Sequence, residues 1–202
     1  MPIIQTDKTL RDRHPQDFYP TAGVVVGAAL RRVQPTEGIN TILDVGAGTG
    51  VWGEVAKRRY FPKAKIIGVE LRPVSANPHY DVWLRGDFRL VNIPDPVDLV
   101  MGNLPFMYAE PCLKRSVELV KPRKGKIMFL LPLTFLAGQD RRLDVYGEYP
   151  PTYVYVLSRR PSFIHEGPKA GKTDNTEYAF YFWDFALPPD EPRIRWVDWQ
   201  QQ

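Results

Sequence analysis

The sequence predicts an α/β protein in which a mostly parallel sheet carries helices on both faces. Short apolar runs typical of strands alternate with amphipathic stretches typical of helices through most of the 202 residues. A glycine-rich segment follows the first of these runs and opens a helical pattern, as at the first turn of many βαβ units. The length favours one domain, 1–202, which is large enough to bury a core without disulfides.

Seven strands are expected, at residues 41–45, 65–71, 81–84, 97–101, 126–131, 153–157 and 178–185. The first helix is expected over 22–33, with Thr21 as its N-cap. Two later helices are marked by apolar residues at helical spacing, namely Val51, Val55 and Ala56 in one and Leu113, Val117 and Val120 in the other. The last two strands lack a long helix between them, so we expect them to form an antiparallel hairpin at the sheet edge.

The composition excludes several classes of protein. Cys112 is the only cysteine, so an intramolecular disulfide and a cysteine-based metal cluster are both ruled out, and no metal site is expected. The early apolar run at 22–30 is too short to span a membrane, and the polar segment before it does not fit a signal peptide. We therefore expect a cytoplasmic protein without a membrane partner. The net charge of +4 is compatible with a polyanionic partner.

The two ends of the chain are expected to be poorly anchored tails, at 1–14 and 188–202. Trp196 and Trp199 nevertheless indicate that the second tail packs against something. Little sequence follows the last expected strand, so we expect no separate target-recognition domain.

The segment from Asp44 to Gly50 reads Asp-Val-Gly-Ala-Gly-Thr-Gly and predicts a tight loop that a ligand can approach closely. It differs from the Gly-x-Gly-x-x-Gly of dinucleotide folds and lacks the Gly-Lys-Ser/Thr ending of phosphate-binding loops. Glu70 ends the next strand, where an acidic group can bind ribose hydroxyls. Together these residues resemble the first motifs of class I methyltransferases. The resemblance implies the Rossmann-like fold of that class and S-adenosylmethionine as cofactor, with Asp44 near its ammonium group.

Asp87 and Phe88 follow the third expected strand. The resemblance implies that Asp87 accepts a hydrogen bond from the cofactor's adenine and that Phe88 lies against the ring; an ordinary Gly-Asp turn gives the same pattern. The whole expected cofactor site comprises Tyr19, Pro20, Thr21, Asp44, Gly46, Ala47, Gly48, Gly50, Glu70, Leu71, Asp87, Phe88 and Asn103.

Asn103-Leu104-Pro105-Phe106 follows the fourth strand and resembles the Asn/Asp-Pro-Pro-aromatic motif of amino methyltransferases. An exocyclic base amine is a poor nucleophile, and acceptors for both its hydrogens stabilise the positive charge that grows on the nitrogen. The resemblance assigns this role to the Asn103 side-chain oxygen and the Leu104 carbonyl. Pro105 stiffens the loop, and Phe106 stacks on a base flipped out of its helix. The departure is Leu104, where proline is usual. A strand that ends in a proline turn, with a core phenylalanine, is the alternative interpretation.

The flanking segments indicate which amine is the target. Asp17-Phe18-Tyr19-Pro20-Thr21 and the stretches from Phe135 to Arg142, Pro150 to Phe163 and Thr173 to Asp184 resemble small phage or prophage DNA N6-adenine methyltransferases. The resemblance runs from about Asp17 to Asp184. It implies methylation of the N6 amine of adenine in DNA, with RNA a possible substrate.

A basic loop after the sixth strand is a candidate nucleic-acid contact. Arg159, Arg160, Lys169 and Lys172 lie in it, among glycines and prolines. A solvated edge loop would have the same composition. We read Cys112 as a core residue, not as the nucleophile of a cytosine-ring methyltransferase.

Two alternative functions remain open at this point. One is an RNA-base or protein-glutamine N-methyltransferase that uses the same pocket. The other is a non-catalytic module that binds S-adenosylmethionine or nucleic acid.

Overall fold

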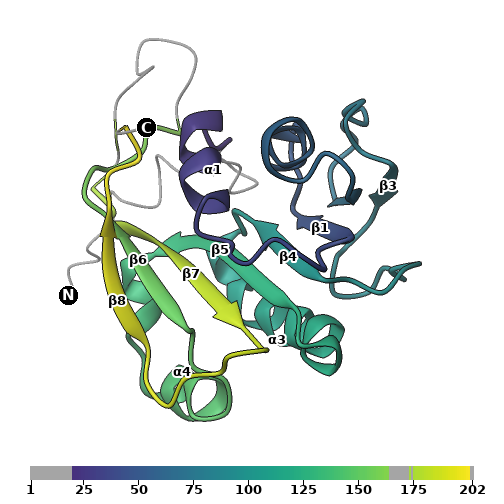
Figure 1. Cartoon of the computed structure of the whole chain (residues 1–202). Coiled ribbons are helices and arrows are strands. Elements are labelled where there is room, and N and C mark those ends of the chain that lie inside the picture. The colour runs from purple at the N-terminus through teal and green to yellow at the C-terminus, as the bar shows by residue number, and fades with distance from the viewer. Residues whose placement is uncertain (1–19, 164–172, 174, 201–202) are drawn as a thin grey trace, which may run out of the picture.

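A computed structural model describes residues 20–163, 173 and 175–200. One eight-stranded sheet forms the centre of the described structure, and helices lie on both of its faces (Figure 1). The strand order is β3-β2-β1-β4-β5-β7-β6-β8. The predicted α/β architecture with a mostly parallel sheet is confirmed, with one strand more than expected.

The strands are β1 (Thr41–Val45), β2 (Lys65–Glu70), β3 (Val82–Arg85), β4 (Leu99–Gly102), β5 (Lys126–Pro132), β6 (Tyr153–Leu157), β7 (Tyr178–Asp184) and β8 (Arg193–Val197). Pairing is parallel between β1 and β2, β1 and β4, β2 and β3, β4 and β5, and β6 and β8. Only β7 runs the other way, between β5 and β6. The carboxyl ends of β1, β2, β3 and β4 therefore meet at one edge of the sheet.

The helices are α1 (Gly23–Leu30), α2 (Val51–Val55), α3 (Ala109–Val120) and α4 (Gln139–Arg141), with shorter 3-10 or π segments η1 (Ala56–Tyr60), η2 (Phe106–Tyr108), η3 (Lys121–Arg123), η4 (Leu133–Leu136) and η5 (Arg142–Tyr146). Successive strand residues point to opposite faces. Ile42 packs with α1 and α2 in one buried cluster, and its neighbour Leu43 packs with α3 in the other. The two clusters cover the two faces of the sheet, as predicted for a parallel α/β protein.

The carboxyl-terminal strand β8 corrects the prediction of a weakly anchored tail. It pairs with β6, and the Ser158 amide donates a hydrogen bond to the Val197 carbonyl at 3.0 Å. The predicted antiparallel hairpin of β6 and β7 is present, but β8 and not the hairpin forms the sheet edge. Trp199 packs as expected, since its indole N–H donates to the Arg159 carbonyl at 2.7 Å, whereas Trp196 is 71% exposed.

The start of α1 also differs from the prediction. Ala22 is the N-cap, and no side chain caps the helix. Thr21 is buried, and its hydroxyl oxygen accepts hydrogen bonds from distant residues. A threonine before an apolar helical run is a local capping signal, but here long-range partners engage the hydroxyl.

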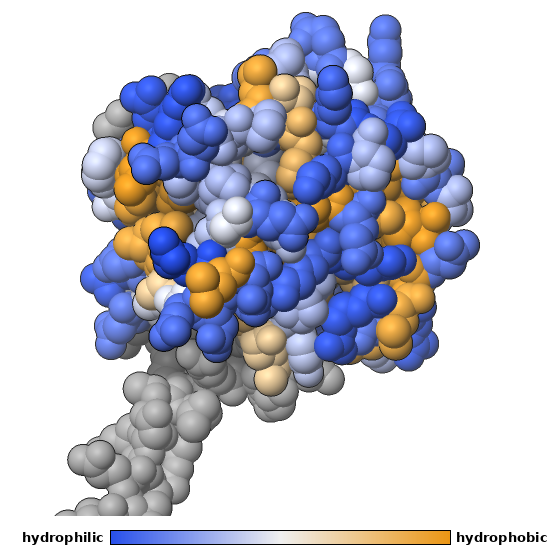
Figure 2. Space-filling view, turned by 90° about the horizontal axis from the view of Figure 1, so that it is seen from below, coloured by the Kyte–Doolittle hydropathy of each residue, from blue (hydrophilic) through white to orange (hydrophobic). Residues whose placement is uncertain are grey.

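In the described part of the chain, no helix is long and apolar enough to cross a lipid bilayer. On the face seen from below, apolar residues lie in several separate groups among hydrophilic ones (Figure 2). Scattered apolar groups of this kind are normal on a protein surface.

Lys126 and Asp184 form a buried ion pair between β5 and β7. Their side chains are 8% and 4% exposed, and the Lys126 ammonium donates to the Asp184 carboxylate. The register places the two residues directly opposite each other. A buried carboxylate that loses its only cationic partner is left desolvated and uncompensated.

We therefore predict that Lys126→Ala lowers the free energy of unfolding by roughly 3–5 kcal/mol. Urea unfolding followed by circular dichroism measures the change. The exposed Lys63 provides the control, because Lys63→Ala removes the same charge and should change stability by less than about 0.5 kcal/mol. Equal losses for the two variants would contradict a structural role for the pair.

Candidate active site

The glycine-rich loop between β1 and α2 is held against the end of β2. The amides of Gly46 and Ala47 both donate to the Val69 carbonyl, at 2.9 and 3.0 Å. Gly50 has a φ of 88°, and a Cβ built on it would lie 2.5 Å from the Asn77 side chain. The Asn77 amide nitrogen donates to the Thr49 carbonyl at 3.1 Å. Glycine is thus required at Gly50 both for its backbone conformation and for space.

The end of β4 lies directly beside this loop. A Cβ on Gly46 would lie 3.9 Å from Pro105 Cδ and 4.0 Å from the Asn103 carbonyl oxygen. Gly102 has a φ of 154°, and its own Cβ would lie only 2.5 Å from the Val45 carbonyl oxygen. The two motifs singled out in the sequence therefore face each other at one edge of the sheet.

Asp44 is fully buried at the end of β1. One carboxylate oxygen accepts a hydrogen bond from the Tyr80 hydroxyl, which in turn accepts one from the Gly53 amide at 2.9 Å. The other oxygen, Oδ1, has no hydrogen-bond partner among the residues that the structure describes. Burial raises the pKa of Asp44 to about 7, although the Tyr80 hydrogen bond opposes the shift. The site thus contains a fully buried carboxyl group with one oxygen that has no hydrogen-bond partner among the described residues.

Glu70 closes the loop from the end of β2. Its Oε2 accepts a hydrogen bond from the Gly48 amide at 2.7 Å, and its Oε1 accepts from the backbone and side chain of Arg72 at 2.8 and 2.9 Å. Burial opposes ionisation of this carboxyl, but the hydrogen bonds from Arg72 and Gly48 outweigh it and lower the pKa of Glu70. Glu70 is therefore an anionic group next to the loop.

Asp87 lies beside Glu70, since the Gly86 amide donates to the Glu70 carbonyl at 3.0 Å. Hydrogen bonds from Arg89 to the Asp87 carboxylate lower the pKa of Asp87. Phe88 is 5% exposed and belongs to the buried cluster on the α3 face. Its ring is therefore a core contact, and little of its surface is available to a ligand.

Asn103 is joined to the start of α1. Its amide nitrogen donates to Thr21 Oγ1 at 3.1 Å, and the Trp52 indole N–H donates to the same oxygen at 3.3 Å. The Thr21 hydroxyl therefore lies within hydrogen-bond distance of both the Asn103 amide and the Trp52 indole. Thr21, expected from the sequence at the cofactor site, thus contacts Asn103 directly.

In the rest of the tetrapeptide, the Leu104 side chain lies inside the core and the Phe106 side chain lies at its surface. Leu104 is 2% exposed and packs in the cluster on the α3 face. The carbonyl of Pro105 accepts a hydrogen bond from the Tyr108 amide at 2.9 Å, which begins a short turn. Phe106 is half-buried, with its ring centre 6.0 Å from that of Tyr178. The backbone of this segment is thus fixed on both sides of Leu104.

Cys112 lies in α3 below this site and is 6% exposed. Burial raises the pKa of its thiol to about 11. A neutral, buried thiol is a poor nucleophile, in agreement with its interpretation as a core residue.

The two described residues expected to contact nucleic acid, Arg159 and Arg160, both form ion pairs with carboxylates. Arg159 pairs with Asp198 at 3.2 Å, and Arg160 pairs with Glu177 at 3.5 Å. Leu71, expected at the cofactor site, is 63% exposed beyond the end of β2. Tyr19, Lys169 and Lys172 lie outside the described residues.

Several residues at the site were not found by sequence reasoning, namely Trp52, Arg72, Asn77, Tyr80 and Arg89. Each forms a hydrogen bond to Thr21, to the glycine-rich loop or to a carboxylate already identified. Tyr80 precedes β3 in a segment without periodicity, so no local pattern reveals its bond to Asp44. Only the pairing of β2 with β1 and β3 brings them together.

Comparison with known proteins gives partial relatives. No family model matches the chain. A 72-residue segment is 31% identical to a ribosomal RNA large subunit methyltransferase E from Bdellovibrio bacteriovorus, over 31% of this chain and 37% of that protein. A 97-residue segment is 29% identical to a tRNA1(Val) (adenine(37)-N6)-methyltransferase from Bacteroides thetaiotaomicron, over 43% and 39%. The matches span less than two fifths of the length of these relatives.

Solved structures cover more of the chain. The methyltransferase subunit of a type I restriction-modification system from Streptococcus thermophilus matches with a TM-score of 0.65 and 14% identity, over 89% of this chain and 47% of that one. A SAM-dependent O-methyltransferase from Thermotoga maritima matches with a TM-score of 0.55 and 17% identity, over 92% and 72%. At these identities the likeness concerns the fold, and it confirms the predicted class I methyltransferase fold.

The raised pKa of Asp44 predicts a pH dependence of stability. In the unfolded chain this carboxyl loses its proton near its ordinary value of 3.8, whereas in the folded protein it keeps the proton up to about pH 7. The folded state therefore binds more protons between these values, so stability falls as the pH rises through that interval. Relative to Asp44→Asn, we expect the wild type to lose roughly 2–4 kcal/mol of unfolding free energy between pH 4 and 8.

Chemical denaturation of both proteins across this pH range measures the difference. Asp140→Asn is the control, because Asp140 is exposed and should leave the wild-type pH profile unchanged. Parallel pH profiles for wild type and Asp44→Asn would show that the buried carboxyl titrates normally.

Proposed function

We propose that this chain is an S-adenosylmethionine-dependent methyltransferase that acts on the exocyclic N6 amine of adenine in a nucleic acid, with DNA as the first substrate to test. The observation that carries the proposal is the position of Asn103. Its amide is hydrogen-bonded to Thr21 at the end of β4, directly beside the glycine-rich loop. An oriented acceptor beside a cofactor loop is the arrangement that amine methylation requires.

The residues at the end of β1 and β2 fit the cofactor. The unpartnered Oδ1 of the buried Asp44 is an acceptor for an ammonium donor. The oxygens of Glu70 already accept hydrogen bonds, but a carboxylate oxygen has a second lone pair for a ribose hydroxyl. Asp87 lies next to Glu70 and would accept from the adenine amino group. S-adenosylmethionine supplies an electrophilic methyl group when it is bound there.

The tetrapeptide supplies the environment of the target amine. The Asn103 side-chain oxygen and the Leu104 carbonyl accept its two hydrogens and stabilise the charge that grows on the nitrogen. The buried side chain of Leu104 anchors the carbonyl in the absence of the usual proline. Phe106, packed against Tyr178, offers a ring for stacking of a flipped base.

DNA and RNA are both candidates for the polymer. The flanking segments resemble DNA adenine methyltransferases of the small phage or prophage type, and the Streptococcus neighbour belongs to a restriction-modification system. RNA is the second candidate because the two partial curated relatives are named as RNA methyltransferases, one of them for adenine N6.

Cofactor binding should release a proton near pH 6. Asp44, with a pKa of about 7, is mostly protonated there, and a cationic group beside it favours the ionised form. Isothermal titration calorimetry with S-adenosylmethionine in two buffers of different ionisation enthalpy measures the protons released. We expect close to one for wild type at pH 6 and none for Asp44→Asn. Equal values for the two proteins would remove Asp44 from the site.

Labelled cofactor incubated with duplex DNA, single-stranded DNA or RNA, followed by nucleoside analysis, tests the reaction itself. We expect N6-methyladenine and a loss of roughly 10²–10³ in rate for Asn103→Ala. Asn40→Ala is the matched control, because Asn40 is exposed and bonds only to the Gly38 carbonyl through its side chain.

Each other result of this assay identifies a different function. Label on cytosine, or full activity of Asn103→Ala, would refute the mechanism. Label on RNA alone would select the second candidate. Label on protein glutamine alone, or tight cofactor binding without any transfer, would replace nucleic-acid methylation by one of the two alternative functions.

A further inference from the structure

Five exposed arginines gather where α1, η1, β6 and β8 come together, and we call this surface the arginine face. Its members are Arg31, Arg32, Arg59, Arg193 and Arg195, together with Tyr153 and Tyr155. Arg31 and Arg32 follow α1, Arg59 lies in η1, and the other two arginines lie in β8. The arginines come from three segments far apart in the sequence, so no single charge run reveals the surface.

Ring contacts order one half of the arginine face. The Tyr153 and Tyr155 rings are stacked, with centres 5.3 Å apart and planes 18° apart. The Arg32 guanidinium lies 5.8 Å from the centre of the Tyr155 ring, and that of Arg193 lies 5.8 Å from the Tyr153 ring. The Arg193 guanidinium also donates to the Tyr153 hydroxyl at 3.2 Å. Cation–π contacts of this kind hold guanidinium groups in place without neutralising their charge.

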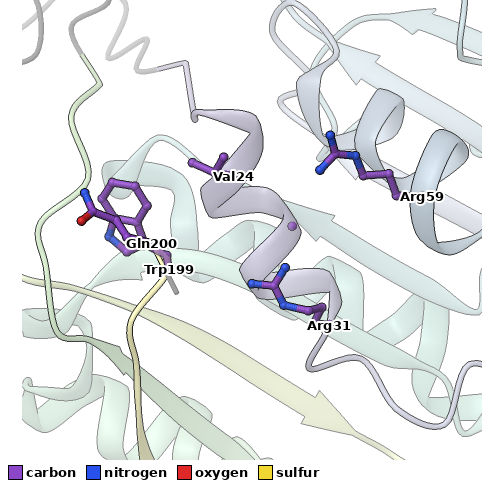
Figure 3. Close-up of a pocket in the computed structure, with 6 residues that line it drawn as sticks. Val24, Arg31, Arg59, Trp199 and Gln200 are labelled. Atoms are coloured by element: carbon purple, nitrogen blue, oxygen red, sulfur yellow. The ribbon is translucent and has the colours of Figure 1, made fainter. Parts of the chain in front are cut away.

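A pocket lies in the other half of the arginine face. It has a volume of about 250 Å³ and is lined by Val24, Gly27, Arg31, Arg59, Trp199 and Gln200. Figure 3 shows α1 between Trp199 and Gln200 on one side and Arg59 on the other. The volume is below the roughly 300–1,000 Å³ of pockets that hold drug-sized ligands, so it fits a part of an extended molecule. Two guanidinium groups at its wall favour a phosphate.

The charge of the arginine face is not neutralised by carboxylates. None of its five arginines forms an ion pair within the described ranges, whereas the expected nucleic-acid residues Arg159 and Arg160 are both paired. Among the residues that the structure describes, the Arg31 side chain donates only to the Tyr60 hydroxyl, at 3.4 Å. Exposed unpaired arginines attract a polyanion more strongly than paired ones, because no ion pair has to be broken.

The helix α1 connects the arginine face to the candidate active site. Thr21, two residues before α1, bonds to Asn103, and Arg31 follows the other end of the helix. Eight helical residues span about 12 Å. A strand of a few nucleotides can therefore span the distance from Thr21 to Arg31.

We propose that the arginine face binds the phosphodiester backbone of a single nucleic-acid strand whose target base enters the candidate active site. The charge calls for phosphates, and aromatic rings beside basic side chains are found on surfaces that bind single strands. This inference rests on the proposed function, since it assigns the substrate strand a path to the same site. It replaces Arg159 and Arg160 as the main predicted contacts.

Fluorescence anisotropy with labelled DNA and RNA single strands of about 12 nucleotides, and with a duplex of the same length, tests the path. For Arg32→Gln/Arg193→Gln we expect about tenfold weaker binding of single strands at 0.1 M salt. The slope of log affinity against log salt should become shallower by about 1.4. The control is Lys121→Gln/Arg142→Gln, which removes the same charge from η3 and η5, in the half of the molecule that carries α3, and should bind like the wild type.

The results separate this inference from the proposed function, because binding is measured without methyl transfer. Equal loss of binding in both double variants, or preference for the duplex, would overturn the arginine face while methylation of adenine stands. If only Arg32→Gln/Arg193→Gln loses single-strand binding and the wild type methylates no nucleic acid, the arginine face is supported and the proposed reaction is rejected. A wild type that binds none of the probes would reject both. The DNA and RNA arms show which polymer the face prefers.

Discussion

The closeness of β1 and β4 at their carboxyl ends is the constraint on which the site depends. Gly102 passes so near the Val45 carbonyl that a Cβ would lie 2.5 Å from that oxygen, and only glycine permits this. The approach places the glycine-rich loop against Asn103 and Pro105. Once these backbones are adjacent, Thr21 at the start of α1 can reach the Asn103 amide. Backbone packing thus brings the residues expected at the cofactor site and the expected acceptor residues to one edge of the sheet.

The sequence predicted the features that have local signals. Short, nearly continuous apolar runs identified the inner strands, because a strand that is buried on both faces must be apolar throughout. Three closely spaced glycines identified the loop. β8 was missed because four of its five residues are exposed and its pairing with β6 is long-range. Tyr80 was missed for a similar reason, since its bond to Asp44 exists only after β1, β2 and β3 have paired. Thr21 was expected as a helix cap and as a cofactor-site residue; it caps no helix, and its hydroxyl bonds instead to Trp52 and Asn103 across the fold.

The same contrast applies to charge: a run of charged residues is visible in the sequence, whereas a charged surface built from distant segments forms only when the chain folds. A run such as Arg159-Arg160 is visible in the sequence, but Asp198 and Glu177 neutralise it once the chain folds. Arg32 and Arg193 are far apart in the sequence, but they lie on one surface. Arg32 contacts the Tyr155 ring, Arg193 contacts the Tyr153 ring, and the two rings are stacked. Net charge therefore says little about where a polyanion binds. Which arginines and lysines lack a carboxylate partner is a better guide to where a polyanion binds.

The buried side chain of Leu104 changes how the tetrapeptide should be searched for in other genomes. Its side chain packs in the core, so the shape of the core selects the residue type there, while the substrate would contact only a carbonyl that every amino acid possesses. Such a position is free to drift whenever the surrounding helix packing drifts. A pattern that insists on two successive prolines will overlook chains like this one. A looser pattern, with any apolar residue between the asparagine and the proline, includes this chain.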